Sequence, residues 1–297
     1  MKKLTVLLFV LLTCCEAWAA TPVPKAPAAK AKPASIVVFD SILLGGFENG
    51  KWLSPTEAAP RIAGSENYSI YSFAKHLGNG VGSAVEIDED TECEIVAIQA
   101  DVPEGLALLA LHDKTGKGKL TWNPVPRKAT VLGRQNETYK KVVKDVLAQN
   151  GLSNASPQIM QIFRIDLEGD GVDEVVLYAQ NGVDPKEYPN KWEPDQELLG
   201  ETGLPFESKK DAYSLLLLRK IVGGKVRNIP LASFIYARDH EKWNIPLVHK
   251  IFQFADVNGD GIMEIITGSA YYEGLGYSVY AVKGGDVEAV LSNSMGH

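Results

Sequence analysis

Cysteine is scarce in this chain, with three residues in 297, and two of them, Cys14 and Cys15, lie within its first fifteen positions. Only Cys93 stands in the rest of the sequence. A network of intramolecular disulfides is therefore excluded as a source of stability. The fold must depend on its hydrophobic core and its hydrogen bonds.

Long hydrophobic runs are also missing. The apolar run at residues 4–12 is much shorter than the roughly 20 residues that span a bilayer. Two lysines precede it and the small-residue stretch 17–20 follows it, which is the layout of a secretory signal. We therefore predict a signal peptide over residues 1–19, no transmembrane segment, and a periplasmic or secreted location.

Two readings of the N-terminus stay open. Leu-Leu-Thr-Cys resembles a lipoprotein signal, so a lipid anchor at Cys14 is the alternative to cleavage after Ala19. In either case residues 20–35, rich in Pro, Ala and Lys, cannot bury a core. We expect them to form a linker.

The sequence has few signs of catalysis or of nucleic-acid binding. Neither HExxH nor GxSxG occurs, and the five histidines lack metal-ligand spacing. The formal net charge of −7 makes nucleic acid an improbable partner class. These absences favour a non-enzymatic protein.

Short apolar or alternating segments, broken by Gly, Asn and Asp, follow the linker and predict strands. One interruption, residues 137–150, has apolar residues at helical spacing and predicts a packing helix. We expect a mainly β fold with an N-terminal β-rich region at 36–130. A repeat region, 131–297, should follow, and its segment 184–210 reads as a long surface excursion.

Two acidic loops in the second region share one pattern. They read Asp166-Leu-Glu-Gly-Asp-Gly-Val-Asp-Glu174 and Asp256-Val-Asn-Gly-Asp-Gly-Ile-Met-Glu264, with oxygen-bearing side chains at positions 1, 3, 5 and 9. Calcium prefers six to eight oxygen ligands, and such alternation directs several of them inward. Position 12 is not acidic and strands are expected on both sides, so the loops are not EF-hands. They are alternatively plain acidic turns.

This arrangement resembles the calcium loops of FG-GAP and VCBS-type repeats of bacterial surface proteins and integrin β-propellers. The resemblance implies a propeller-like or related multi-hairpin β architecture and two calcium sites. It assigns the ligands of the first site to Asp166, Glu168, Asp170, Val172 (carbonyl) and Glu174. Those of the second are Asp256, Asn258, Asp260, Ile262 (carbonyl) and Glu264. The second site is the stronger candidate, because Glu168 is longer than the usual ligand at position 3.

The sequence therefore predicts an exported calcium-binding β-repeat protein. Its expected role is that of a non-enzymatic module that binds an unknown protein or glycan at the cell envelope. The alternative is an exported hydrolase with structural calcium.

Overall fold

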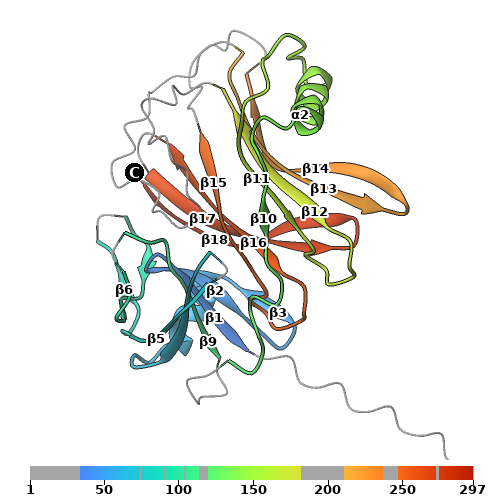
Figure 1. The fold of residues 1–297 in the computed structure, drawn as a ribbon. Coiled ribbons are helices and arrows are strands. Elements are labelled where there is room, and N and C mark those ends of the chain that lie inside the picture. Colours follow the sequence, from blue (N-terminus) through green and yellow to red (C-terminus); the bar gives the residue numbers. More distant parts are fainter. Residues whose placement is uncertain are drawn as a thin grey trace, which may run out of the picture. The chain divides into compact units, whose positions relative to one another are not determined.

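The computed structural model describes residues 34–73, 75–89, 91–103, 105–113, 120–181, 211–236, 247–271 and 274–296. All belong to one compact unit, Lys32–His297. The predicted signal peptide, most of the predicted linker and the 184–210 excursion lie outside the described residues. The prediction of a mainly β fold is confirmed (Figure 1). No helix in the described ranges is long and apolar enough to cross a membrane.

A nine-stranded sheet forms the first part of the fold, with the strand order β6-β7-β2-β1-β9-β4-β5-β8 and β3 paired to β2. Its strands are β1 (Ser35–Phe39), β2 (Ile42–Glu48), β3 (Lys51–Leu53), β4 (Asn67–Ser72), β5 (Lys75–Gly82), β6 (Glu86–Ile87), β7 (Glu94–Ile95), β8 (Ile98–Gln99) and β9 (Leu109–Asp113). A short helix α1 (Pro55–Ala58) and a 3-10 turn η1 (Ala59–Arg61) follow β3. The Ser54 and Glu57 side chains cap α1 reciprocally.

Strand β5 contains three glycines and pairs with β4 from Lys75 to Val81. Glycine is needed at its end because a Cβ atom at Gly82 would lie 2.4 Å from the Tyr68 ring. Strands β7 and β8 are separate, because between them Val96 donates its N–H to the Ser41 carbonyl.

Two antiparallel meanders complete the fold, each with its strands in chain order. The first contains β10 (Thr130–Val131), β11 (Ile159–Ile165), β12 (Glu174–Gln180), β13 (Tyr213–Val222) and β14 (Lys225–Ile235). The second contains β15 (Val248–Ala255), β16 (Glu264–Tyr271), β17 (Gly274–Lys283) and β18 (Asp286–Gly296). In both, the acidic loop joins the first two long strands and a Gly-Gly turn joins the last two.

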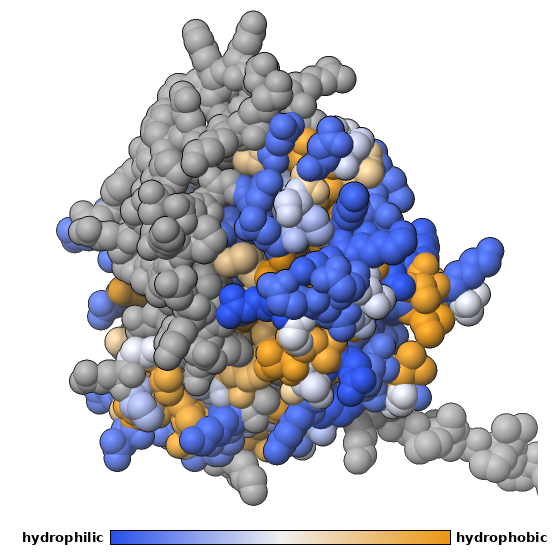
Figure 2. Space-filling model, turned by 45° about the horizontal axis from the view of Figure 1, so that its top comes forward, coloured by the Kyte–Doolittle hydropathy of each residue, from blue (hydrophilic) through white to orange (hydrophobic). Residues whose placement is uncertain are grey.

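Strand β14 is the edge of its sheet, and more than half of its residues are exposed. The hairpin that it forms with β13 projects from the fold (Figure 1), and hydrophobic and hydrophilic residues lie side by side on this projection (Figure 2). Most of β13, by contrast, is buried. The hairpin is therefore buried where it joins the sheet and exposed at its tip.

Helix α2 (Glu137–Gln149) confirms the predicted packing helix within one residue. The Asn136 side chain accepts a hydrogen bond from the Thr138 N–H and caps its start. Its buried residues, Val142, Val143, Val146 and Leu147, pack in one cluster with residues of β11, β12 and β13. The helix thus covers one face of the first meander.

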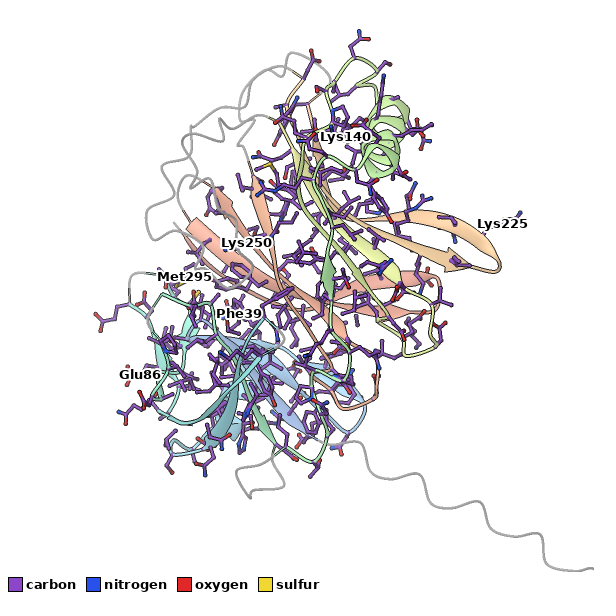
Figure 3. All side chains as sticks on the ribbon, in the orientation of Figure 1. Phe39, Glu86, Lys140, Lys225, Lys250 and Met295 are labelled. Carbon is purple, nitrogen blue, oxygen red and sulfur yellow. The ribbon has the colours of Figure 1, made fainter. Side chains whose placement is uncertain are left out.

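The largest core cluster joins the nine-stranded sheet to both meanders. The Phe39 ring lies 5.1 Å from that of Phe252 and 4.8 Å from that of Tyr277, as measured between centroids (Figure 3). The Tyr277 hydroxyl donates a hydrogen bond to Asp40 in the β1–β2 turn. The N-terminal region and the meanders therefore share one core.

The buried histidine His249 of β15 makes stability depend on pH. Burial lowers its pKa to about 4, and the centroid of its ring lies 5.8 Å from that of Tyr178 and 5.9 Å from that of Phe234. The unfolded chain, with a histidine pKa near 6.5, binds more protons between pH 6.5 and 4. We expect the contribution of His249 alone to lower the free energy of unfolding by roughly 3 kcal/mol as the pH drops through this window.

Urea melts of the wild type, His249→Leu and the exposed-site control His76→Gln would measure this dependence. His249→Leu should lose this part of the pH slope, and His76→Gln should keep it. An unchanged slope in His249→Leu would show that other groups cause it.

Candidate metal centre

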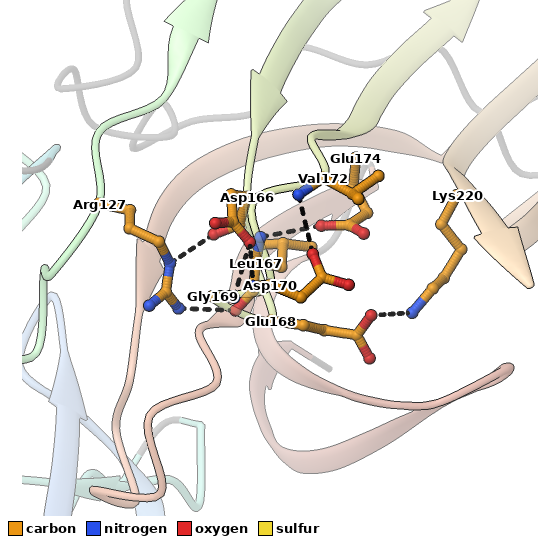
Figure 4. A network of polar contacts seen from close by, with 9 residues as sticks. All are labelled: Arg127, Asp166, Leu167, Glu168, Gly169, Asp170, Val172, Glu174 and Lys220. Carbon is orange, nitrogen blue, oxygen red and sulfur yellow. Dashed lines mark hydrogen bonds and ion pairs between the residues drawn. The ribbon is translucent and has the colours of Figure 1, made fainter.

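The first acidic loop folds around the carboxylate of Asp166, between β11 and β12 (Figure 4). Oδ1 accepts hydrogen bonds from the N–H groups of Gly169 (2.6 Å) and Asp170 (3.2 Å), and Oδ2 accepts one from Gly171 (3.1 Å). Both glycines have positive φ, 75° and 83°, which residues with a Cβ rarely adopt. The loop therefore wraps around the side chain of its own first residue, Asp166.

The second loop repeats this geometry between β15 and β16. Asp256 Oδ1 accepts from Gly259 (2.6 Å) and Asp260 (3.1 Å), and Oδ2 accepts from Gly261 (2.9 Å). At position 5 of both loops the Asp side chain accepts a hydrogen bond from the N–H of position 7, that is Val172 or Ile262, at 2.9 Å. The repeat seen in the sequence is therefore also a repeat of hydrogen bonds.

The glutamate at position 9 ties each loop to the start of its second strand. Glu174 Oε2 accepts from the Leu167 N–H (2.8 Å), and Glu264 Oε2 accepts from the Val257 N–H (2.9 Å). The side chains of Leu167 and Val257 are fully buried, so position 2 anchors the loop in the core. Both glutamates are themselves buried.

Position 3 separates the two loops. Glu168 accepts a hydrogen bond at 2.7 Å from the ammonium group of Lys220 on β13, whose side chain is 1% exposed. Asn258 instead donates from Nδ2 to Glu264 Oε1 (3.0 Å) and accepts the Asp260 N–H at Oδ1. At position 3, therefore, the first loop has a carboxylate paired with a lysine, and the second loop has a neutral amide.

The charge balance differs accordingly. Burial raises the pKa of Glu174, but the nearby Lys220 acts to lower it. In the second loop burial raises the pKa of Asp256 and holds that of Glu264 well above its usual value, and neighbouring carboxylates raise both further. Within the described ranges no lysine or arginine pairs with an acidic side chain of this loop.

The predicted ligands of each loop lie around one short turn, but they do not form a ready-made cluster for a metal. Their side-chain oxygens accept hydrogen bonds from the loop's own N–H groups, and Val172 and Ile262 are engaged through their N–H. In the part of the chain that the structure describes, no group of three or more His, Cys, Asp or Glu side chains is arranged to hold a metal. Since a carboxylate oxygen has more than one acceptor site, calcium stays a prediction.

Arg127 is the central residue that sequence reasoning missed. Its Nε donates to the carbonyl of Asp166 (2.5 Å), and its Nη2 donates to those of Leu167 (2.8 Å) and Gly261 (2.8 Å). One guanidinium thereby bonds to both acidic loops. A Cβ atom at Gly169 would lie 2.8 Å from Nη1, so glycine also leaves room for this side chain.

Further contacts hold the two loops together. The Met263 N–H donates to the Leu167 carbonyl (2.9 Å), which links the loops directly. Trp122 Nε1 donates to the Asp256 carbonyl (2.8 Å), and the Asp256 N–H donates to that of Pro124 (2.7 Å). The segment 122–127 thus fastens both loops, and we call it the clasp.

Of the two basic residues that contact the acidic loops, Lys220 and Arg127, only Lys220 could have been recognised from the sequence. Lys220 shares its strand face with Leu218 and follows a run of four leucines, so a charge at this buried position was detectable. Arg127 stands in a proline-flanked stretch without periodicity. Its partners are carbonyl groups tens of residues away, which no local pattern encodes.

Replacing Arg127 with Met should lower the free energy of unfolding by roughly 2–4 kcal/mol, because three carbonyl groups lose a charged donor. Arg127→Lys should recover little of this loss, since one ammonium group cannot reproduce the planar fork. Urea melts would measure both variants against the exposed Arg134→Met, which should change stability by less than about 0.5 kcal/mol. Equal effects of Arg127→Met and Arg134→Met would contradict the role of the clasp.

Comparison with known proteins found no family model, no curated protein and no solved structure that matches this chain. The likeness to FG-GAP and VCBS-type repeats therefore rests on the two loops alone.

Proposed function

We propose that this chain is an exported calcium-binding β-repeat protein that acts as a non-enzymatic interaction module at the cell envelope. The observation that carries the proposal is the second acidic loop. Its carboxylates Asp256 and Glu264 are buried and lie near Asp260, without a positive side chain to pair with them among the described residues. A divalent cation would offset this desolvated negative charge.

The donor chemistry of this loop fits calcium. Asp256, Asp260 and Glu264 supply hard carboxylate oxygens, and Asn258 and the Ile262 carbonyl supply neutral ones. No thiol or imidazole belongs to the set, which disfavours zinc and other softer metals. Calcium would take over the charge compensation that the loop's own N–H groups now supply in part.

The first loop should bind calcium more weakly. Lys220 already gives Glu168 a positive partner at 2.7 Å in a buried position. The Lys220 ammonium group already offsets the charge of Glu168 and would repel a second cation, so calcium should gain less electrostatic stabilisation at this loop than at the second. The proposed order of affinity is therefore the second loop, Asp256 to Glu264, above the first, Asp166 to Glu174.

A structural role for calcium suits an interaction module. The candidate ligands Glu174 and Glu264 also hold their loops to the strands that follow, and the clasp connects one loop to the other. Calcium would stiffen the joined ends of both meanders, and the surface they support would bind a protein or glycan at the envelope. Catalysis would need carboxylates that are not engaged in this way.

Thermal melts with calcium and with EDTA test this proposal. A ligand at a hundredfold excess over its Kd stabilises the folded state by about 2.7 kcal/mol. For a domain of this size that amounts to an increase in Tm of roughly 5–10 °C. Equal melting temperatures in calcium and EDTA would contradict the proposal.

The same position in both loops provides matched variants. Asp260→Ala should remove most of the calcium-induced increase in Tm, whereas Asp170→Ala should leave most of it. Both variants lose the same local hydrogen bond to position 7, so the comparison isolates the metal. A larger loss in Asp170→Ala would reverse the proposed order of the sites.

A further inference from the structure

The tip of the β13–β14 hairpin exposes aliphatic side chains. Ile221 and Val226 face each other across the hairpin and are 51% and 53% exposed. Lys225, which begins β14 after the Gly-Gly turn, extends from the far end of this projection (Figure 3). The tip thus combines a cross-strand pair of exposed aliphatic side chains with an adjacent lysine.

The charge of this hairpin is entirely positive. Residues 212–236 contain Arg219, Lys220, Lys225 and Arg227 and no acidic residue, in a chain of net charge −7. Lys220 pairs with Glu168, and Arg219 donates to Asn228. Across the described ranges, Lys225 and Arg227 form no ion pair.

The second meander shows that the turn itself does not require this composition. Its β17–β18 hairpin has the same Gly-Gly turn, but Asp286 balances Lys283 there. Val282, before that turn, is 3% exposed, whereas Ile221 stands open at the first tip. The basic and aliphatic character therefore distinguishes the β13–β14 tip from the β17–β18 tip.

We infer that the tip formed by Ile221, Val226, Lys225 and Arg227 docks onto an anionic phospholipid surface. The register places Ile221 and Val226 on one face of the hairpin and Lys225 and Arg227 on the other, so the tip would enter end-on. The aliphatic side chains would then enter the headgroup region, and the two cations would contact lipid phosphates. A soluble polyanion would use the charges but gain nothing from the exposed aliphatic pair. The inference extends the proposed envelope role by naming a partner class, but the tip contains no calcium ligand.

Vesicle sedimentation tests this inference on the chain from residue 20 onward. The wild type should bind phosphatidylcholine vesicles that contain phosphatidylglycerol, and it should not bind pure phosphatidylcholine vesicles. Binding should weaken in high salt. It should be the same in calcium and in EDTA, so that a failed calcium site leaves this result unaffected. No binding of the wild type to the anionic vesicles would overturn the inference.

Paired variants assign the effect to the tip. Each cation near an anionic membrane contributes about a fivefold change in partitioning, so Lys225→Glu with Arg227→Glu should lower binding at least about 20-fold. The control, Lys75→Glu with Lys144→Glu, reverses two exposed charges elsewhere and should change binding much less. Every variant keeps the lysines of residues 20–35, so these cannot produce the difference. Equal binding by the tip variant and the control would refute the assignment.

The aliphatic pair has its own test, with the folding of all variants verified by their melting curves. Ile221→Ser with Val226→Ser should also lower vesicle binding, since insertion loses its apolar part. If this variant binds vesicles as tightly as the wild type does, the proposed insertion of the aliphatic pair is wrong and the tip recognises charge alone. Tight binding to polyglutamate that is weakened by the same double variants would identify an acidic polypeptide as the partner and reject the lipid.

Discussion

The guanidinium of Arg127 holds together the parts of this fold that matter for its proposed function. Its three bonds to carbonyl groups reach both acidic loops, which are 90 positions apart in the sequence. Trp122 and the backbone of Pro124 add bonds to the second loop. Because each loop joins the first two long strands of its meander, the clasp also links the two meanders to each other. A displacement of one loop should therefore also displace the other, since both are bonded to Arg127.

The two loops solve the same electrostatic problem in different ways. Each buries carboxylates against its own N–H groups, which compensates negative charge only in part. The first loop adds the buried Lys220 as a cation, whereas the second has no such residue within the described ranges. The proposal of calcium at the second loop follows from this difference. The repeat has thus diverged at position 3 and in the strand that faces it.

Local patterns in the sequence predict many of the elements of this fold. Contacts between residues distant in the sequence determine the features that they do not predict. The helix at Glu137–Gln149 and the strand-loop-strand modules were predictable because periodicity and turn residues encode them locally. The glycine at the end of β5, Gly82, serves a close approach to Tyr68, which only the folded state reveals. The role of Arg127 could not be predicted for the same reason, because its partners are backbone carbonyls far along the chain.

Calorimetric titration with calcium shows whether the second loop binds this ion. We expect one strongly bound calcium per chain, preserved in Asp170→Ala and lost in Glu264→Gln, which keeps the size of the side chain but removes its charge. Strong binding that survives in Glu264→Gln, or no binding by the wild type, would show that the second loop is not a calcium site.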